Sequence, residues 1–263
     1  MNILVCIKQV PDMDGRFIPN AEGTWFEEAG HAFRMNDYDL YAIEAAVMLK
    51  EQLGGAPEVT VLSIGPDRVI EVIRKALALG CDRGVHIRDP LVAQKDPWQI
   101  ASMIAGYGRT RNFDLIFTGM QSQDRGSAQV GVFVSELLGI ACVTTLVGFS
   151  WNDGIMTVER ELEGGKRGVV RLTSPALLTC QLGLNTPRYP TLPNIMKSKK
   201  KKINTLLPDE VTSANPLTSV TGCVHPERKG FGMVLEGNVS ELADRVIAVL
   251  NEKTTMLSRG GRR

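Results

Sequence analysis

The sequence has few of the residues that metal centres and disulfide frameworks need. It contains five cysteines and three histidines in 263 residues. No two cysteines have the CxxC spacing of zinc sites and redox-active pairs. None of the histidines, His31, His86 and His225, lies near a cysteine or another histidine along the chain. We therefore expect no metal site and no disulfide framework, and we expect a reducing compartment, the cytoplasm.

Long apolar runs and a charge excess of one sign are also missing. Every apolar run is far shorter than the roughly 18 residues of a membrane-spanning helix. The first ten residues lack the pattern of a signal peptide and instead predict a strand. With 30 Lys and Arg against 29 Asp and Glu, the net charge is +1. Because such a balance favours neither nucleic acid nor an anionic membrane, we interpret the lysine run 199–202 as a solvated face.

Motifs of several common enzyme classes are absent as well. The chain has no GxSxG elbow, HExxH pair, P-loop or GxGxxG fingerprint, which leaves hydrolytic catalysis and generic nicotinamide binding without support. The hydrophobic content of 43% is too high for a largely disordered chain. These observations favour one globular domain, or one domain with an arm.

Strand and helix patterns alternate through the first half of the chain. Residues 3–7 form a continuous apolar run, as expected of a parallel strand buried on both faces, and further strands are predicted at 59–64, 85–87 and 115–117. Helical stripes follow them, with helix starts at Asn36, Asp67, Asp96 and Val130. Asn36 and Asp96 are predicted N-caps, and Gly80 is a predicted helix stop. The alternation predicts an α/β fold with a doubly wound, mostly parallel, Rossmann-like sheet.

The second half of the chain has a different pattern. Residues 156–162 and 169–172 alternate with a period of two around a predicted turn at Gly164-Gly165, which indicates added antiparallel strands. A further strand is predicted at 176–180, and a short hairpin at 14–26 with turns at Gly15 and Gly23.

No strand or amphipathic helix is evident between 183 and 202, and the only later helix pattern is at 242–250. We therefore divide the chain into an α/β domain at 1–183, a surface loop with the lysine run at 184–205, and a C-terminal arm at 206–263 that packs on a partner.

A ligand site is expected beyond the carboxyl ends of the parallel strands. Cys6, the segment 63–66 and the long polar loop 119–131 all lie there. The loop runs into a helix N-terminus, whose free N–H groups suit phosphate, and Arg125 could add charge. The alternative is an ordinary turn in which Ser127 caps the helix. Residues 36–39 likewise fit either a helix cap or purine recognition.

The segment GLNTPRYPTLPNIMK at 183–197, with the lysine run behind it, resembles the beta subunit of electron transfer flavoproteins. A resemblance to the same family is also seen at residues 5–12, 35–36, 76–84, 119–130 and 158–165. The resemblance extends to about residue 205, and beyond it the match is loose.

The resemblance implies a heterodimer with an alpha subunit that carries most of a shared FAD, while the beta subunit holds AMP. Such a pair relays electrons from acyl-CoA dehydrogenase-type flavoenzymes, as in fatty acid oxidation, to a quinone-reducing or other acceptor. No bond-making chemistry is expected of the chain itself. Carried over by position, the AMP and cofactor residues are Cys6, Asn36, Asp37, Tyr38, Asp39, Ile64, Gly119, Met120, Gln121, Ser122, Gln123, Asp124, Arg125, Gly126, Ser127, Ala128, Gln129 and Val130.

Two further roles follow from the resemblance. Tyr38 holds the place of an aromatic residue that approaches the flavin ring. Leu192, between Pro190 and Pro193, holds the place of the leucine that docks on partner dehydrogenases. A leucine fixed between prolines loses little entropy on binding. The alternative is that Leu192 packs into the core of its own domain.

Two other functions stay open. Bifurcating members of the family hold a second FAD in place of AMP and typically carry Asp-Gly-Asp-Thr in the phosphate loop. Here that place reads Asp-Arg-Gly-Ser at 124–127, which favours AMP, because Arg125 could pair with one phosphate and leave no room for a diphosphate. The following residues 129–131 resemble the bifurcating branch. A stand-alone adenine-nucleotide-binding hydrolase is the third alternative, and it gives no reason for the segment 184–202.

Overall fold

The computed structural model describes residues 1–212, 214–225 and 232–254. It groups the chain into two compact units, Met1–Cys223 and Val224–Arg263. The second unit contains helix α6 (Val239–Lys253), which begins at a capping box between Asn238 and Glu241 and matches the predicted late helix. Within the described ranges, no helix has both the length and the apolarity needed to cross a bilayer.

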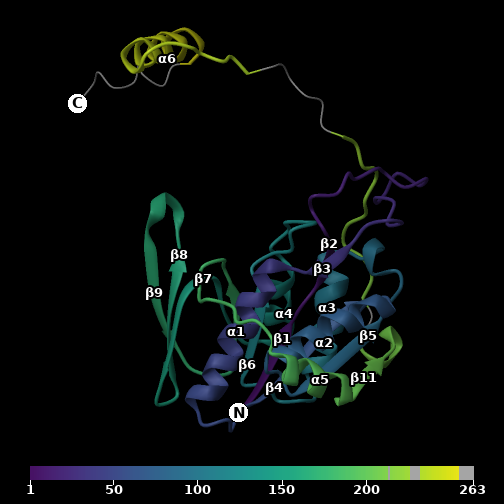
Figure 1. Ribbon diagram of the computed structural model, residues 1–263. Coiled ribbons are helices and arrows are strands. Elements are labelled where there is room, and N and C mark those ends of the chain that lie inside the picture. Colours follow the sequence, from purple (N-terminus) through teal and green to yellow (C-terminus); the bar gives the residue numbers. More distant parts are fainter. Residues whose placement is uncertain (213, 226–231, 255–263) are drawn as a thin grey trace. The chain divides into compact units, whose positions relative to one another are not determined.

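The first unit is built on a nine-stranded sheet in the order β11-β5-β4-β1-β6-β10-β7-β8-β9 (Figure 1). Its strands are β1 (Asn2–Cys6), β4 (Glu58–Gly65), β5 (Arg83–Arg88), β6 (Leu115–Gly119), β7 (Ala141–Asn152), β8 (Ile155–Glu161), β9 (Arg167–Leu172), β10 (Ala176–Cys180) and β11 (Ile203–Leu206). All neighbours from β11 to β7 are parallel, whereas β8 and β9 are antiparallel. The predicted mostly parallel sheet with added antiparallel strands is confirmed.

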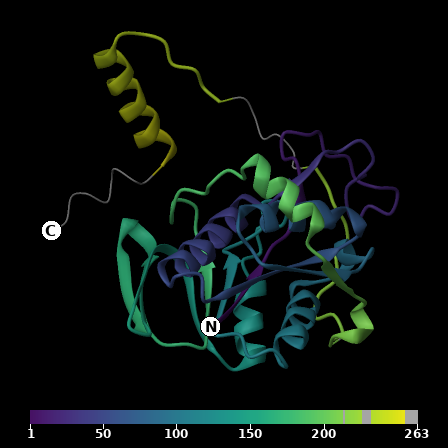
Figure 2. The same cartoon turned by 60° about the horizontal axis from the view of Figure 1, so that its bottom comes forward.

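Helices cover both faces of this sheet (Figures 1 and 2). They are α1 (Asp37–Gln52), α2 (Ile70–Leu79), α3 (Pro97–Gly108), α4 (Val130–Leu138) and α5 (Leu192–Lys200), with short 3-10 turns η1 (Asp67–Val69), η2 (Val92–Gln94), η3 (Glu163–Gly165) and η4 (Pro208–Glu210). Alternate residues of β1 enter two separate cores. Ile3 joins the core under α1 and α2, and Leu4 joins the core under α3 and α4. A continuous apolar strand is what this two-sided burial requires.

Two predicted helix boundaries are confirmed, and both have a local physical cause. Asp96 accepts a hydrogen bond from the backbone N–H of Gln99 and forms a capping box in front of Pro97. Gly80 ends α2 with φ of 130°, a conformation that a residue with a Cβ adopts only with strain.

The predicted hairpin at 14–26 is present only in part, as an antiparallel turn at Gly23 without a ladder of strands. The antiparallel pair in this region is β2 (Gln9–Pro11) with β3 (Phe33–Met35), and they bracket a long excursion, residues 12–32. Inside the excursion one isolated bridge joins Pro19 and Phe26, and Gly23 turns between them with φ of 66°. Ring contacts among Phe17, Phe26 and His31 give the excursion a small aromatic core in place of a ladder.

The segment 184–205 is not the predicted loop. It contains α5, which begins after the cap Thr191 and packs on α2, and β11, which pairs with β5 at the edge of the sheet. Arg74 donates hydrogen bonds to the carbonyls of Ser198 and Lys201 and thereby fixes the end of α5. The helix is short and mostly exposed, and its three apolar residues with helical spacing, Leu192, Ile195 and Met196, are too few to indicate a helix in the sequence.

Residues 207–212 and 214–223, predicted to belong to an arm, are instead part of the first unit. The Asp96 carboxylate accepts hydrogen bonds from the backbone N–H groups of Leu217 (2.6 Å) and Thr218 (2.9 Å). The backbone N–H of Cys223 donates to the carbonyl of Gly23 at 2.6 Å. The boundary between the two compact units therefore falls at 223–224, later than the predicted boundary at 205–206.

Candidate functional site

A cavity lies at the carboxyl edge of the parallel sheet, where β1 is flanked by β4 on one side and β6 on the other. The strand order reverses at this point, so the loops after β1, β4 and β6 separate and leave a crevice. Many of the residues carried over from the resemblance line it: Cys6, Asn36, Asp39, Ile64, Gly119, Met120, Gln121, Ser122, Asp124, Arg125, Ser127, Ala128 and Val130. The lining does not include Asp37, Tyr38, Gln123, Gly126 or Gln129.

The loop after β6 brings the start of α4 to this cavity. Gly126 (φ 60°) and Ala128 (φ 52°) take left-handed conformations that curl the loop. The N-cap residue of α4 is Gln129, and no side chain caps the helix, so the expected Ser127 cap is wrong. The first N–H groups of α4 have no intrahelical acceptor, and Val130 and Gly131 line the cavity. This helix start can bind an anion.

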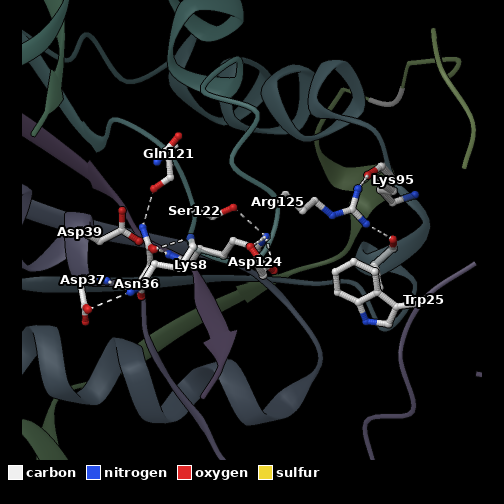
Figure 3. Close-up of polar contacts among 12 residues, drawn as sticks. Lys8, Trp25, Asn36, Asp37, Asp39, Lys95, Gln121, Ser122, Asp124 and Arg125 are labelled. Atoms are coloured by element: carbon white, nitrogen blue, oxygen red, sulfur yellow. Dashed lines mark hydrogen bonds and ion pairs between the residues drawn. The ribbon is translucent and has the colours of Figure 1, made fainter. Parts of the chain in front are cut away.

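Asn36 does not cap its helix, contrary to that prediction, although it occupies the N-cap position of α1. Its side-chain amide donates to the carbonyl of Gln121 at 2.9 Å, and its side-chain oxygen accepts from the backbone N–H of Gln123 at 3.0 Å (Figure 3). Asp37 accepts from the Gln123 amide at 2.9 Å, and the Tyr38 hydroxyl accepts from the Gln121 amide at 3.0 Å. The start of α1 therefore shapes the loop after β6.

Asp39 ties the ends of two neighbouring strands together. Its buried carboxylate accepts from the backbone N–H of Lys8 at 2.7 Å and from that of Gly119 at 3.1 Å. Burial raises the pKa of Asp39 to about 7, against the lowering effect of these hydrogen bonds. A Cβ at Gly119 would lie 2.7 Å from the Cβ of Tyr38 and would also collide with the Asp39 carboxylate. Only glycine allows this close approach.

Lys8 and Arg125 are two of the cationic residues that line the cavity. The Lys8 ammonium lies 2.7 Å from the Asp124 carboxylate and donates to the Ser122 hydroxyl at 3.2 Å. Burial lowers the pKa of Lys8, although Asp124 counteracts this. The Arg125 guanidinium donates to the carbonyls of Ala93 and Lys95 and lies 4.7 Å from the centre of the Trp25 ring (Figure 3). Arg125 thus connects the loop after β6 to the 12–32 excursion.

Sequence reasoning missed another part of the cavity lining. Gln9, Trp25, Phe26, Phe33 and Arg68 line it, and four of them come from β2, β3 and the excursion between them. The Trp-Phe pair at 25–26 is the one signal that could have pointed to them. Because aromatic residues make up only 6% of the chain, an adjacent pair in a polar segment is unusual.

A group of exposed apolar side chains lies outside the cavity, at the start of α5. Leu192 is 77% exposed, so the alternative that it packs into its own core is wrong. Tyr189 and Met196 are exposed beside it in sequence. We call residues 189–196 the α5 tip. An apolar side chain presented on a capped helix start is suited to contact with another protein.

Comparison with known proteins gives the family. A protein-family model described as "Electron transfer flavoprotein domain" matches residues 23–211 of this chain. The chain belongs to the electron transfer flavoprotein family. A protein of Bacillus subtilis (strain 168) named electron transfer flavoprotein subunit beta is 34% identical over 98% of this chain and 100% of its own length. The subunit beta of Methylophilus methylotrophus is 33% identical over 96% of this chain and 98% of its own length.

Another relative has a different name. The caffeyl-CoA reductase-Etf complex subunit CarD of Acetobacterium woodii is 33% identical over 96% of this chain and 99% of its own length. Membership of the electron transfer flavoprotein family confirms the resemblance seen in the sequence, and it favours the electron-transfer expectation over the hydrolase alternative.

Proposed function

We propose that this chain is the subunit of a two-subunit electron transfer flavoprotein that binds AMP in the cavity at the edge of its sheet. The observation that carries the proposal is the uncapped start of α4, which faces the cavity through Val130 and Gly131. The phosphate would bind there, and the ribose and base would extend across the end of β1. Asn36 and Asp39 hold the surrounding loop in its binding conformation.

We further propose that an alpha subunit completes the protein and carries most of a shared FAD. FAD supplies the redox chemistry when bound, and this chain provides one wall of the FAD site. Tyr38 is the residue of that wall nearest the flavin ring. Tyr38 fits this place because its ring is only half-buried and its hydroxyl is held by Gln121. In this arrangement the chain relays electrons from an acyl-CoA dehydrogenase-type flavoenzyme to a quinone-reducing or other acceptor.

The α5 tip would dock the electron donor. Its support is the exposure of Leu192 together with the rigidity of its surroundings, since Thr191 caps α5 and Arg74 fixes the other end of the helix. A rigid apolar anchor binds a partner pocket with little loss of conformational entropy.

The test is the nucleotide content of the complex. The chain is co-expressed with the alpha subunit of its own organism, and the purified complex is denatured with acid and chromatographed. We expect AMP and FAD in about a one-to-one ratio. A complex that releases FAD without any AMP would overturn the proposed AMP site. A chain that carries FAD as a monomer, without the alpha subunit, would overturn the shared arrangement.

A second candidate is the form with a second FAD in place of AMP. It is favoured by the similarity to the Acetobacterium woodii subunit of a caffeyl-CoA reductase-Etf complex and by residues 129–131. It is opposed by Arg125, whose side chain crosses from the loop after β6 to the carbonyls of Ala93 and Lys95 at the border of the cavity. Release of two FAD and no AMP would decide for this candidate.

A further inference from the structure

The excursion at residues 12–32 bridges two of the loops that form the cavity. On one side, the Glu28 carboxylate lies 3.0 Å from the Nη2 of Arg68, in the turn after β4. On the other side, the Arg125 guanidinium of the loop after β6 lies 4.7 Å from the centre of the Trp25 ring (Figure 3). All four residues line the cavity. Since β4 and β6 flank β1 on opposite sides, the excursion crosses the crevice at the end of β1.

Little within the excursion itself holds it in this position. Each of residues 12–32 is at least partly exposed, and a single isolated bridge, between Pro19 and Phe26, takes the place of a ladder. The Trp25 indole N–H donates to the Glu28 carboxylate at 3.2 Å, so the contacts on the two sides of the crevice are linked. A segment with so few buried contacts can open locally while the core stays folded.

A second segment, residues 214–223, connects α3 to the turn of the excursion, and we call it the strap. At its beginning, the carbonyl of Ala214 accepts a hydrogen bond from the Gln99 side-chain amide at 3.1 Å. At its end, the backbone N–H of Cys223 donates to the carbonyl of Gly23 at 2.6 Å. Gly23 lies at the turn of the excursion, so the strap fastens the excursion at a point far from its base in β2 and β3.

Asp96 anchors the strap on the body of the first unit. One of its carboxylate oxygens, Oδ1, caps α3 by accepting from the backbone N–H of Gln99. The other oxygen, Oδ2, accepts from the backbone N–H groups of Leu217 and Thr218 in the strap. A charged acceptor makes such bonds stronger than neutral ones. The strap is therefore fixed at α3 and can hold Gly23 in place.

We propose that the excursion is a lid over the nucleotide and that the strap latches this lid shut. The lid opens when the contacts of Trp25 and Glu28 break, and the bond from Cys223 to Gly23 opposes that movement. A nucleotide then leaves the cavity only while the lid is open. The inference rests on the proposed nucleotide site, and it goes beyond that site by assigning the route and the control of nucleotide release.

The expected size of the effect follows from the latch being one backbone hydrogen bond. When the lid opens and closes faster than the nucleotide leaves, the release rate is proportional to the fraction of time that the lid is open. Loss of one hydrogen bond of ordinary net strength raises that fraction about threefold to tenfold. The release rate should rise by the same factor, although Cys223 does not line the cavity.

The first test measures AMP release from the complex with its alpha subunit. The complex is loaded with radiolabelled AMP and chased with excess unlabelled AMP. Cys223→Pro, which lacks the backbone N–H, should release AMP about threefold to tenfold faster than the parent. Cys223→Ala is the matched control, because it keeps the N–H and loses only the thiol, and it should release AMP at the parent's rate.

Release at the parent's rate from Cys223→Pro would overturn the latch while leaving the nucleotide site intact. Equally fast release from Cys223→Pro and Cys223→Ala would overturn it as well, because the thiol would then matter and the N–H would not. If the parent complex binds no AMP at all, the proposed function fails, and the inference fails with it.

The second test loosens the other end of the strap. Asp96→Asn keeps an acceptor for the N–H of Gln99 but turns an amide N–H group toward the N–H groups of Leu217 and Thr218. Asp96 does not line the cavity, and Asp96→Asn should also release AMP faster than the parent. Combined with Cys223→Pro, it should add little, because both act through one strap. Independent effects that multiply would contradict the strap as a single latch.

The third test observes the lid directly by limited trypsin digestion of the same complexes. Arg16 is the only lysine or arginine in residues 12–32, so a cut after Arg16 reports on the excursion. Since proteolysis follows the population of the open form, Cys223→Pro should be cut there about threefold to tenfold faster than Cys223→Ala. Its midpoint in denaturant unfolding should match that of Cys223→Ala. Faster AMP release without a faster cut after Arg16 would show that the nucleotide leaves by another route and would overturn the lid.

Discussion

Arg188 holds Glu44 with its guanidinium and with its own backbone. Its Nε and Nη2 each lie 2.9 Å from a Glu44 carboxylate oxygen, and its backbone N–H donates to the same carboxylate at 3.1 Å. Glu44 lies on α1 and its side chain is 7% exposed. The ion pair therefore ties the chain just before the α5 tip to the helix whose start shapes the cavity loop.

Arg188→Leu should destabilise the protein by about 3 kcal/mol, because it leaves the Glu44 carboxylate buried and unpaired. The double variant Arg188→Leu with Glu44→Leu should recover much of the loss, since the uncompensated charge is gone. Denaturant unfolding of the complex measures both. The matched control is Arg167→Leu, which breaks an exposed pair with Glu159 and should cost less than about 1 kcal/mol. Equal losses for Arg188→Leu and Arg167→Leu would contradict the prediction.

Leu192→Ala should weaken docking of the electron donor without changing the fold. Burial of one leucine in a partner pocket contributes roughly 1.5–3 kcal/mol, so electron transfer at limiting donor concentration should slow by roughly tenfold or more. Nucleotide content and thermal stability should stay at the parent's values, because Leu192 is 77% exposed. Leu217→Ala removes a leucine that is 66% exposed on a different segment and serves as the control. The docking role is wrong if both variants transfer electrons like the parent.

The parts of the fold that the sequence predicts well are those governed by local chemistry. The two-sided burial of β1 requires a continuous apolar run, and the caps at Asp96 and Gly80 need particular residue types. These signals are short-range, so the sequence displays them directly. By contrast, α5 is held by packing on α2 and by a hydrogen bond from Arg74 to Ser198, 124 positions away, and the sequence does not display such long-range contacts.

In the candidate site, too, local signals could be predicted from the sequence and long-range contacts could not. The loop after β6 is recognisable because glycines and polar residues cluster between a strand and a helix. The role of Asn36 was misread, since a side chain that caps a helix and one that braces a loop 85 residues away look alike in sequence. Gln9 and Arg68 carry no motif at all. They face the cavity because β2 and the turn after β4 are neighbours in the folded chain.

Gly119→Ala should distort the cavity strongly, although it adds only one methyl group. The added Cβ would lie 2.7 Å from the Cβ of Tyr38, where backbone and side chain cannot easily yield. We expect a loss of about 1–3 kcal/mol in unfolding free energy and a reduced AMP content in the purified complex. Gly108→Ala is the control, because its Cβ would meet Leu138 at an ordinary 3.5 Å. A Gly119→Ala complex with full AMP content would show that the loop is not fixed by this contact.

The pH dependence of stability should report on Asp39. Its pKa is about 7 in the folded chain, because burial disfavours the charged form, and about 4 in an unfolded chain. A raised pKa in the folded state means that the folded chain binds the Asp39 proton more tightly than the unfolded chain does. The contribution of Asp39 is therefore fully present below about pH 4 and is lost as the pH rises toward 7.

Asp39→Asn removes this titration. We expect the stability of the parent relative to Asp39→Asn to be greater at pH 5 than at pH 8. The difference is measured by denaturant unfolding of both proteins, stripped of nucleotide, at the two pH values. The contributions of the other titrating groups are shared by both proteins and cancel in the comparison. A parent that gains stability over the variant from pH 5 to pH 8 would instead mean that the hydrogen bonds from Lys8 and Gly119 outweigh burial and keep Asp39 charged.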